Sequence, residues 1–555
     1  MRIRQLWVAI ASVGTAIITF RMDGQVTSER LLNAAKEPHN WLSYSGDYAS
    51  RRYSLLTQIT PANVKDLELK WMLQANVIGK WQATPLVVDG IMYVTQRMND
   101  VVALDARSGQ VFWVFRHPVP ADQQACCGSN NRGLAIHGDT LYMGTLDGRL
   151  IAIDSKTGRA RWDVEVIPYQ NSGYSITVAP LVVKNKVLVG VGGGENGIRG
   201  FLDAYDIDQG KRLWRLYTIP APGEPGHETW KDPAGQAWKS GGGSIWITGS
   251  YDPSLNLTYW GTGNPGPDWN PAQRPGDNLY TDSVLAVDPD TGKMKWHFQF
   301  TPNDPYDFDS VQVPVLADIN WRGSPTKVML WANRNGFFYV LNRETGKFLF
   351  GRPFVKVNWA SGLDANGRPI QTPVPDGSPI FPGVQGGTNW YSPSYSPRTG
   401  LFYIPTWENY SATIRRQPQE YQAGRSFTGG GWSVVTPVPG APSPGPLGRG
   451  PINNWTEATG TGAVLALHPH TGEPAWKFTM TDVTDSGILT TASDLLFTGG
   501  REGNFQALDA RTGKLLWMSR LGAQIVNGPI TYSVDGKQYI STIAGLSLVT
   551  FALRN

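Results

Sequence analysis

The sequence predicts an all-β protein: an eight-bladed β-propeller of four-stranded antiparallel blades, closed by strands from both termini. Three observations predict this fold. The 555 residues include 63 Gly and 40 Pro, a composition typical of many short strands joined by turns. One strand-turn-strand phrase recurs along the chain, and the two ends each hold part of one further unit. Four-stranded units with a periodic aromatic residue are typical of propeller blades.

The charge balance is close to neutral. Lys and Arg total 49 and Asp and Glu total 45, which gives a formal net charge of +4. There is no basic cluster, so the sequence argues against nucleic acid as a partner. Hydrophobic residues make up 41% of the chain, enough to form a large core.

The N-terminal segment predicts export from the cytoplasm. Two arginines precede an apolar run from Leu6 to Phe20, which is shorter than the roughly 20 residues that a membrane helix needs. No clean cleavage site follows, so an uncleaved anchor stays open. We therefore divide the chain into residues 1–35, an export signal or N-terminal anchor, and residues 36–555, a single propeller domain, and we expect a periplasmic protein.

The repeated phrase has two strands of apolar residues joined by a turn with Asp, or a substitute, and Gly. An aromatic residue follows the Gly by four positions each time. Asp and Gly are typical of tight turns, and the aromatic residue is expected to pack between sheets. Upstream of most copies lies a second hairpin, such as TPLVVDGIMYVT, so each unit has four strands. The seven Gly-aromatic pairs are Gly109–Trp113, Gly158–Trp162, Gly210–Trp214, Gly292–Trp296, Gly346–Phe350, Gly472–Trp476 and Gly513–Trp517.

The eighth blade is predicted to combine both ends of the chain. The C-terminal stretch 528–553 has three strands but no final Trp strand, whereas LELKWML at 67–73 has a Trp strand, at Trp71, without its blade. Joining them closes the ring and removes the exposed sheet edge.

Two long spacings interrupt the period of the repeats. The segments 223–243 and 263–278 fall in the first of them and the Pro/Gly-rich segment 436–450 in the second. They are too long for hairpin turns and are candidates for walls over a site on one face. The alternative for residues 436–450 is a disordered loop on the surface.

Polar residues within Gly-rich strands are the candidates for chemistry. Glu195 follows three glycines, Asn264 lies in Gly-Thr-Gly-Asn, and Asp307 and Asp309 are two residues apart in an alternating segment, so they share a face. Carboxylate and amide oxygens are hard ligands suited to a cation such as calcium. The alternative for Glu195 is a solvated turn residue.

The two cysteines, Cys126 and Cys127, are adjacent, which excludes both a Cys-x-x-Cys-His haem site and a zinc ribbon. Consecutive Cα atoms lie ~3.8 Å apart, below the ~4.4 Å usual for a disulfide. In an exported protein a strained vicinal disulfide is expected, and two buried free thiols stay open as the alternative.

Taken together, these motifs resemble one enzyme family. The repeat, the vicinal Cys pair before Asn-Arg-Gly, Gly-Glu after a glycine run, Gly-Gly-Gly-x-x-Trp, Gly-Thr-Gly-Asn-Pro, Asp-x-Asp and Arg-Asn-Gly occur in the order of the pyrroloquinoline quinone (PQQ) dependent methanol/ethanol dehydrogenase family. The resemblance runs from about Trp41 to the C-terminus.

The resemblance implies a cofactor site. The planar PQQ would lie between a floor, Trp246, and a ceiling, the ring formed by Cys126 and Cys127. The remaining cofactor contacts implied are Arg132, Thr177, Gly193, Gly194, Ser244 and Arg334, with Arg334 toward the quinone oxygens. Gln82 stands where members often have Glu, which leaves its role in doubt.

The resemblance also implies a metal site and a catalytic base. Glu195, Asn264 and Asp307 would bind the metal, and Asp307 would also act as general base. Asp309 would be an additional ligand, and an Asp at this place resembles the pattern of the lanthanide-using members. One calcium or lanthanide ion is therefore expected, and a lanthanide is favoured.

The implied reaction is oxidation of a primary alcohol to its aldehyde, with hydride transfer to a metal-polarised quinone carbonyl. A separate cytochrome c is the expected electron acceptor, and a homodimer stays open. Trp407 and Glu408 replace a smaller stretch of the methanol-type enzymes, so methanol is not the expected substrate. One alternative is a non-catalytic propeller scaffold resembling the outer-membrane assembly lipoprotein, which has no need of these residues. Another is a membrane-bound glucose dehydrogenase, which would need several N-terminal membrane spans.

Overall fold

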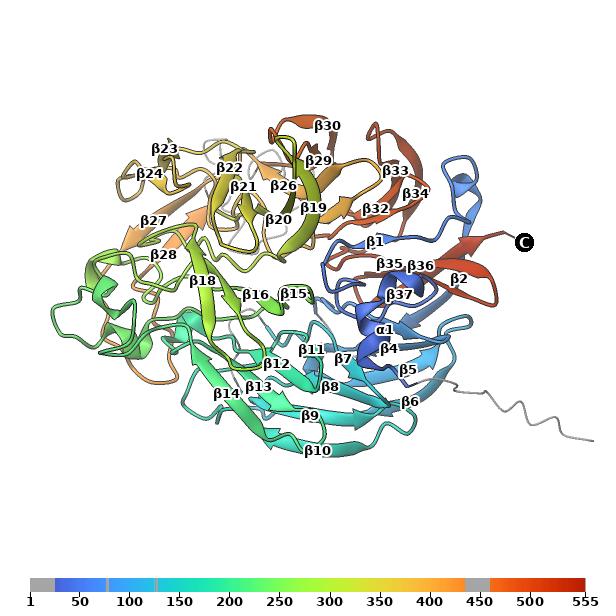
Figure 1. Ribbon diagram of the computed structural model, residues 1–555, viewed down its shortest axis with the longest axis horizontal. Coiled ribbons are helices and arrows are strands. Elements are labelled where there is room, and N and C mark those ends of the chain that lie inside the picture. The colour runs from blue at the N-terminus through green and yellow to red at the C-terminus, as the bar shows by residue number, and fades with distance from the viewer. Residues whose placement is uncertain (1–24, 76–78, 124, 126–127, 435–459, 555) are drawn as a thin grey trace, which may run out of the picture.

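The computed structural model describes residues 25–75, 79–123, 125, 128–434 and 460–554. Over these residues the chain is almost entirely β, and its four-stranded antiparallel sheets stand in a ring (Figure 1). No helix in these ranges is long and apolar enough to cross a membrane. The predicted segment Leu6–Phe20 and the Cys126–Cys127 pair lie outside the described residues.

Seven blades are formed by four strands in chain order from the innermost to the outermost position, and in one of them the separate β27–β28 hairpin is inserted between the second and third strands. They are β3 (Leu86–Val88), β4 (Ile91–Thr95), β5 (Val101–Asp105), β6 (Val111–Phe115); β7 (Ala135–His137), β8 (Thr140–Gly144), β9 (Arg149–Asp154), β10 (Ala160–Glu165); β11 (Leu181–Val183), β12 (Lys186–Gly190), β13 (Phe201–Asp206), β14 (Arg212–Tyr217); β15 (Ser250–Asp252), β16 (Leu257–Gly261), β17 (Ser283–Val287), β18 (Met294–Gln299); β19 (Val315–Trp321), β20 (Ser324–Ala332), β21 (Phe337–Asn342), β22 (Phe348–Pro353); β25 (Ser394–Ser396), β26 (Leu401–Glu408), β29 (Thr461–Leu467), β30 (Pro474–Thr479); and β31 (Leu489–Thr491), β32 (Leu495–Gly499), β33 (Asn504–Asp509), β34 (Leu515–Arg520).

The eighth blade combines both ends of the chain, as predicted. Strands β35 (Ile530–Val534), β36 (Lys537–Ala544) and β37 (Ser547–Leu553) pair in order, and β2 (Leu67–Gln74) adds the outermost strand antiparallel to β37. The prediction of eight four-stranded blades is therefore confirmed.

The elements outside the blades are short. They are strand β1 (Tyr53–Ser54), parallel to β31; the hairpins β23 (Ala360–Leu363)–β24 (Pro369–Gln371) and β27 (Ala412–Arg416)–β28 (Gly430–Val434); helix α1 (Ser28–Leu32); and the 3₁₀ turns η1 (Ala34–Lys36), η2 (Val64–Asp66), η3 (Arg97–Asn99), η4 (Gly194–Asn196), η5 (His227–Thr229), η6 (Ala237–Ser240) and η7 (Pro271–Gln273). Both hairpins fall in the longer of the two interruptions between repeats.

The repeated Gly and Trp form the contact between neighbouring blades. Trp113 of β6 lies over Gly158 in the turn of the next blade, and its indole Nε1 donates to the carbonyl of Ser155 at 3.1 Å. In the same turn, Asp154 Oδ1 accepts hydrogen bonds from the backbone N–H groups of Lys156 and Thr157. The same Trp-over-Gly contact recurs for Trp71–Gly109, Trp162–Gly210, Trp214–Gly292, Trp296–Gly346 and Trp476–Gly513. The residue pattern of the repeat thus encodes the joint between blades.

A segment near the N-terminus, residues 39–52, runs around the inner edge of the ring. It forms hydrogen bonds with seven innermost strands: His39 with β35, Trp41 with β3, Tyr48 with β11 and β15, Ala49 with β19, Arg51 with β25 and Arg52 with β31. The remaining blade is reached by Val26, which pairs with Gly138 in the β7–β8 turn. This inner segment and β2 together join the ends of the ring.

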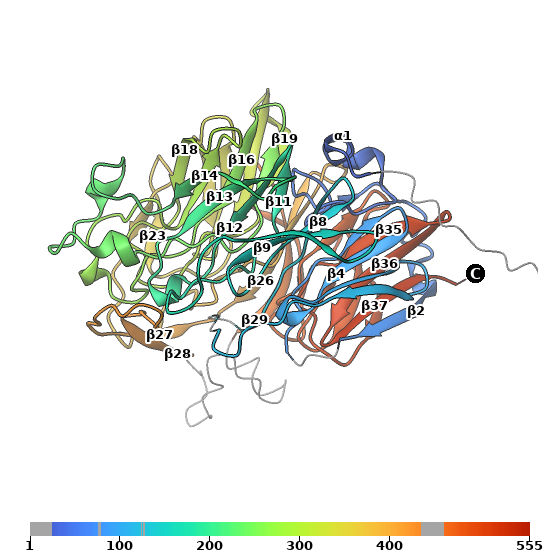
Figure 2. The ribbon, with the colours of Figure 1, turned by 90° about the horizontal axis from the view of Figure 1, so that it is seen from below.

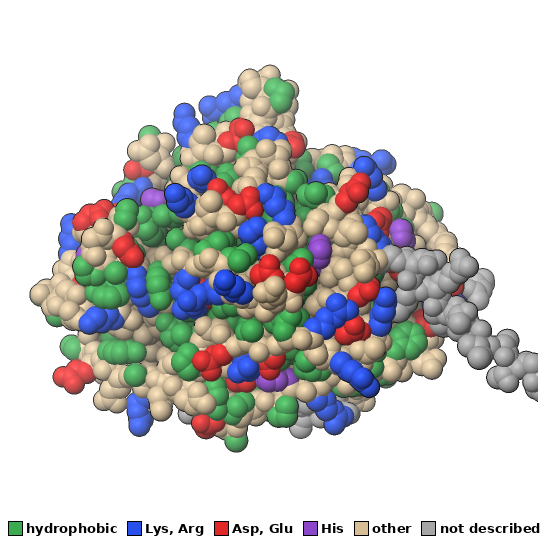
Figure 3. Space-filling model, turned by 60° about the horizontal axis from the view of Figure 1, so that its bottom comes forward, with side chains coloured by type: hydrophobic (Ala, Val, Ile, Leu, Met, Phe, Trp, Pro, Cys, Tyr) green, Lys and Arg blue, Asp and Glu red, His purple; other side chains and the backbone are tan. Residues whose placement is uncertain are grey.

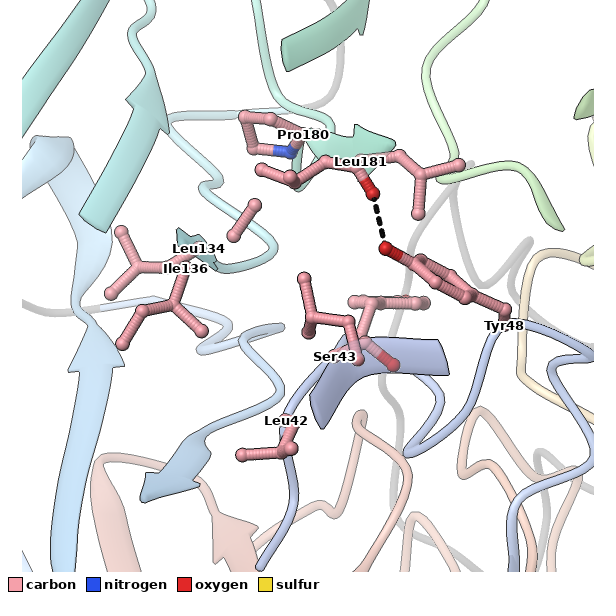
Figure 4. A pocket seen from close by; sticks show the side chains of 11 residues that line it. Leu42, Ser43, Tyr48, Leu134, Ile136, Pro180 and Leu181 are labelled. Atoms are coloured by element: carbon pink, nitrogen blue, oxygen red, sulfur yellow. Dashed lines mark hydrogen bonds between the residues drawn. The ribbon is translucent and has the colours of Figure 1, made fainter. Parts of the chain in front are cut away.

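Arg52 fixes the inner segment in place. Its side chain is fully buried and donates to the carbonyls of Tyr44 at 3.1 Å, Ile488 at 3.1 Å and Pro529 at 2.6 Å. Burial lowers the pKa of Arg52 to about 10. The segment also covers a small cavity of about 10 Å³ between Leu42, Tyr48, Leu134 and Leu181, room for about one water molecule (Figure 4).

Residues 25–35, which the sequence analysis placed with the N-terminal segment, lie against the propeller, with Leu31 buried in its core. Helix α1 and the β27–β28 hairpin lie on opposite sides of the ring (Figure 2). On the face seen in Figure 3, acidic and basic side chains are interspersed.

The Trp-over-Gly contact predicts the cost of adding one methyl group. A Cβ at Gly158 would lie 2.6 Å from Trp113 Cε3, and φ is +69°. A Cβ at Gly400, with φ of +70°, meets no atom within 4 Å. Both Gly158→Ala and Gly400→Ala strain the backbone, but only Gly158→Ala also overpacks, at a further ~1–3 kcal/mol. Denaturant unfolding of both variants measures the difference, and equal destabilisation would contradict it.

Candidate active site

The predicted site residues lie at equivalent places in successive blades. Each stands either just before an innermost strand or just after the second strand of its blade. Residues that precede an innermost strand are Arg132 (β7), Thr177 (β11), Ser244 and Trp246 (β15), and Asp307 and Asp309 (β19); those that follow a second strand are Gly193, Gly194 and Glu195 (β12), Asn264 (β16) and Arg334 (β20). The fold therefore brings residues from four successive blades to the axis of the ring.

Arg334 connects the two aspartates. Its Nη1 donates to Asp309 Oδ2 at 2.8 Å and its Nη2 to Asp307 Oδ2 at 3.0 Å, while Nε donates to the carbonyl of Val384 at 2.8 Å. The arginine is 5% exposed. In this structure its terminal nitrogens therefore hold the carboxylates, whereas the resemblance implied contacts with quinone oxygens.

Asp307 is held in a left-handed conformation, with φ of +59°. Asp304 causes this, because its Oδ1 accepts from the N–H of Tyr306 at 2.8 Å and its Oδ2 from the N–H of Phe308 at 2.6 Å, on either side of Asp307. Among the described residues, the one hydrogen bond to the Asp307 carboxylate comes from Arg334 and is accepted by Oδ2. Burial raises the pKa of Asp307 well above its usual value, Arg334 opposes this, and the Asp309 carboxylate adds to it.

Asn264 and Asp309 are in direct contact. The Asn264 N–H donates to Asp309 Oδ1 at 2.8 Å, and both residues are buried. A Cβ at Gly263 would lie 2.6 Å from Asp309 Oδ1 and 2.7 Å from Ser244 Oγ. Only glycine fits between these side chains, which explains the Gly-Thr-Gly-Asn motif.

Glu195 lies in the single turn η4. Gly193 precedes it with φ of +114°, and a Cβ there would lie 2.1 Å from the carbonyl oxygen of Gly173. Gly193 is thus required by packing. A Cβ at Gly194 would lie 3.3 Å from Ser244 Oγ and 3.8 Å from Asn264 Oδ1, which places the turn beside the other predicted ligands. Burial raises the pKa of Glu195 to about 7, with a smaller contribution from Asp309.

The β27–β28 loop covers Glu195. The Phe427 N–H donates to the Glu195 carbonyl at 2.6 Å, and Tyr421 lies against Gly197. The loop is anchored by the Trp269 N–H, which donates to the Thr428 carbonyl at 2.8 Å. The predicted segment 263–278 thus meets the β27–β28 loop of the second interruption over the site. The predicted segment 436–450 lies outside the described residues.

A second cluster is cationic and aromatic. Arg132 is 5% exposed and lies between the rings of Trp246, at 4.9 Å, and Trp390, at 5.0 Å. Its Nη1 donates to Thr177 Oγ1 at 2.7 Å. Burial lowers the pKa of Arg132 to about 10, and no carboxylate binds it among the described residues. Burial raises the pKa of Asp309, whereas Arg334 and, less strongly, Trp246 oppose this, so the two clusters adjoin in one site.

The residues fit an anionic cofactor together with a cation. Among the described residues, Arg132 Nε is buried without a hydrogen-bond partner and no carboxylate balances its guanidinium, which would bind a carboxylate. Near it, Glu195, Asp307 and Asp309 have Arg334 as their shared counter-charge within the described part of the chain, and their oxygens would bind a hard cation. Arg132 covers one face of Trp246, and a planar cofactor would stack on the other.

The structure does not draw the predicted ligands into a compact set. Oxygens of Glu195, Asp307 and Asp309 do not all lie within 4.8 Å of one another, whereas ligand atoms of Glu37, His39 and Asp89 do. That second group is no metal site, because Arg30 donates to both of its carboxylates.

Sequence reasoning missed several residues around the site. Trp390 covers the Arg132 guanidinium. Two further carboxylates, Asp268 and Asp282, are buried, and both have oxygens that lack hydrogen-bond partners among the described residues. Tyr391 donates to Asp485 at 2.8 Å, next to Trp390. Asp268 follows Asn264 by four residues in GNPGPDW, a signal that could have been read. Gln82, of doubtful role in the sequence, is 7% exposed, and its Oε1 lacks a partner.

Comparison with known proteins supports this arrangement. Residues 41–361 and 454–540 match the model of the PQQ glucose/ethanol/alcohol dehydrogenase β-propeller domain. The quinohemoprotein alcohol dehydrogenase ADH IIB of Pseudomonas putida is 40% identical over 91% of this chain and 73% of its own length. The quinoprotein alcohol dehydrogenase PedH of Pseudomonas putida is 36% identical over 94% of this chain and 88% of its own length.

Solved structures agree. A europium-containing methanol dehydrogenase matches with a TM-score of 0.86 and 35% identity, over 95% of this chain and all of its own. The quinohemoprotein alcohol dehydrogenase ADHIIG from Pseudomonas putida matches with a TM-score of 0.87 and 35% identity, over 95% of this chain and 82% of its own.

The ring of eight blades with oxygen ligands and a buried arginine on its axis defines a propeller oxidoreductase that carries a cofactor in its channel. The chain belongs to the PQQ-dependent glucose/ethanol/alcohol dehydrogenase family. It is a PQQ-dependent alcohol oxidoreductase, which confirms the resemblance and excludes the scaffold alternative.

Asp485 is a buried carboxylate next to the site, and its contribution to stability can be tested. It is 2% exposed and accepts hydrogen bonds from Arg501, Gln524 and Tyr391. Burial opposes its ionisation, but Arg501 and Lys80 outweigh burial and lower its pKa to about 2. Its carboxylate therefore contributes about 2 kcal/mol of stability that is present above about pH 4 and is lost as pH falls towards 2.

Replacement of this carboxylate should show the same pH dependence. We expect Asp485→Asn to lower the free energy of unfolding by about 2 kcal/mol at pH 7. The difference from wild type should shrink below pH 4, as measured by urea unfolding across pH. Asp208→Asn, at an exposed position, is the control. A difference that grows on acidification would refute the assignment.

Proposed function

We propose that this protein is a periplasmic PQQ-dependent dehydrogenase that oxidises primary alcohols to aldehydes, with Asp307 as the general base. The observation that supports it best is the Arg334–Asp307–Asp309 arrangement beside Glu195 and Asn264. The apolar run Leu6–Phe20 supports export.

The cofactor would be held by residues of both clusters. Arg132 and Thr177 would bind carboxylates of PQQ, with Ser244 and Gly194 beside them, and Trp246 would stack on its rings. Glu195, Asn264, Asp307 and Asp309 would bind the metal ion. When bound, PQQ supplies a two-electron acceptor, and the metal ion supplies Lewis-acid polarisation of its carbonyl.

The chain itself supplies proton transfer and orientation. Arg334 holds Asp307 Oδ2, which leaves Oδ1 to accept the proton of the substrate hydroxyl. A cation beside Asp307 and the Arg334 guanidinium both favour its ionised form, which a base requires, and so oppose the effect of burial. The Asp304 carboxylate keeps the base in position through the amides on either side of it.

The electrons are proposed to pass to a separate cytochrome c. One relative is a 1-butanol dehydrogenase (cytochrome c) from Thauera butanivorans, and others are quinohemoproteins. This chain has two cysteines, Cys126 and Cys127, and so lacks the Cys-x-x-Cys-His motif for covalent haem.

Removal of the base should separate binding from turnover. We expect Asp307→Asn to keep PQQ bound, because the amide matches the carboxylate in shape, and to lose ~10²–10⁴-fold in kcat, since a general base contributes that much. PQQ absorbance measures the first and dye-linked alcohol oxidation the second. Asp535→Asn, 71% exposed at the surface, should behave as wild type. Unchanged turnover in Asp307→Asn would reject the role.

The metal can be identified by reconstitution. We expect the metal-free protein with PQQ to gain alcohol oxidation activity with lanthanum more than with calcium, because Asp309 adds a negative oxygen that a trivalent ion binds more strongly. Asp309→Ala should reverse this preference. Full activity with calcium alone would refute the lanthanide preference but retain the alcohol dehydrogenase.

A further inference from the structure

Behind the predicted ligands lies a carboxylate that neither the resemblance nor the repeat pattern assigns. Asp268 is 2% exposed, and its Oδ1 is buried without a hydrogen-bond partner among the described residues. A buried carboxylate without a donor is costly unless a cation or an ordered water binds it. The position of this group therefore requires an explanation.

The backbone holds Asp268 firmly beside Asn264. Arg274, fully buried, donates from Nε to the carbonyl of Pro267 at 3.1 Å and from Nη2 to that of Asp268 at 3.1 Å. On the other side, the Gly243 N–H donates to the Asn264 carbonyl at 3.0 Å. The backbone of the turn from Asn264 to Asp268 is thus fixed at both ends.

The surroundings of Asp268 are acidic. Its pKa lies well above the usual value because of burial first and the Glu195 carboxylate second, while the Asn264 amide and Arg274 act in the opposite direction. Asp282 is also fully buried nearby, with neither carboxylate oxygen bonded among the described residues. Arg274 and Arg334 do not balance the carboxylates gathered here, so a cation of high charge fits the site.

Asn264 needs a partner for its amide nitrogen. An amide presents its oxygen to a cation only when its NH₂ group donates elsewhere. Here the hydrogen bond of Nδ2 is a long one, to the Pro265 carbonyl at 3.5 Å, while the buried Asp268 Oδ1 has no donor among the described residues and lies in the same turn. The Asn264 amide is also close enough to the Asp268 carboxylate to favour its ionised form. Asp268 can therefore decide which way the amide of Asn264 points.

We propose that Asp268 is a positioning residue of the metal site, which turns the Asn264 amide oxygen toward the ion and adds negative charge that favours a trivalent over a divalent cation. This inference rests on the proposed function, because it presumes that Asn264 binds the metal. Outer groups of this kind typically account for 10–100-fold in metal affinity.

The test measures metal binding directly. Metal-free protein with PQQ is titrated with terbium, followed by tryptophan-sensitised luminescence, and with calcium, followed by calorimetry. Asp268→Asn keeps the volume and removes the charge. We expect its dissociation constant for terbium to rise 10–100-fold, and that for calcium to rise less, because the lost charge acts on a smaller ionic charge. Unchanged constants for both ions would overturn the inference.

Two further variants separate positioning from general damage. Asp105→Asn, also a buried carboxylate but in a blade turn, should bind both ions as wild type does. Asn264→Ala should weaken binding, and adding Asp268→Asn to it should cost less than Asp268→Asn costs alone, because the two act through one amide. Fully additive losses would overturn the positioning role. If Asp268→Asn does not fold, Asp268→Glu replaces it, and wild-type affinity in that variant also overturns the inference.

Failure of the proposed function has a different outcome. If wild-type protein binds neither ion in the presence of PQQ, the metal site itself is refuted. If wild type binds and Asp268→Asn binds equally well, the metal site stands and only the role of Asp268 is refuted.

Discussion

The closure of the ring is the constraint on which the rest of this structure depends. A propeller blade exposes both faces of its sheet to its neighbours, so one missing neighbour leaves a core uncovered. Here closure is made twice. Strand β2 pairs with β37 on the outside, and the inner segment from His39 to Arg52 forms hydrogen bonds with seven of the innermost strands. Because the ring is closed, the ends of its innermost strands converge on one axis.

Convergence on the axis explains the electrostatics of the site. Four successive blades contribute side chains at equivalent places, and few of these groups can reach water. Glu195, Asp307 and Asp309 therefore have raised pKa values, while Arg132 has a lowered one. The rigid β-scaffold keeps the acidic cluster of Glu195, Asp307 and Asp309 separate from the cationic Arg132. The result is a site with unsatisfied charge of both signs, suited to a cofactor that carries carboxylates and binds a cation.

The sequence predicted the fold well because its repeat records a local contact. Six of the seven repeat glycines accept a Trp ring from the preceding blade, and Gly472 lies against Phe350 instead. Where a repeat has Asp, as at Asp154, that Asp closes its own turn, so these residues were visible within a dozen positions. The predicted site residues were likewise found from glycines that make room for neighbours, such as Gly263 beside Asp309. Contacts between distant segments could not be predicted. Trp390 over Arg132, Asp485 beneath Tyr391 and the path of the inner segment depend on which blades become neighbours, and no local pattern states this.

The inner segment and the β27–β28 hairpin are constrained differently. The residues of the inner segment are fixed by their hydrogen bonds to the innermost strands. The β27–β28 hairpin lies on the opposite side of the ring from helix α1 (Figure 2), belongs to the connection between β26 and β29 of a single blade, and covers Glu195 through Phe427. Loops of that kind can change length and sequence without disturbing the joints between blades. The wall next to Glu195 is therefore where this chain can differ from its relatives in the alcohols it accepts, whereas the residues proposed to hold the cofactor and the metal are tied to the blades.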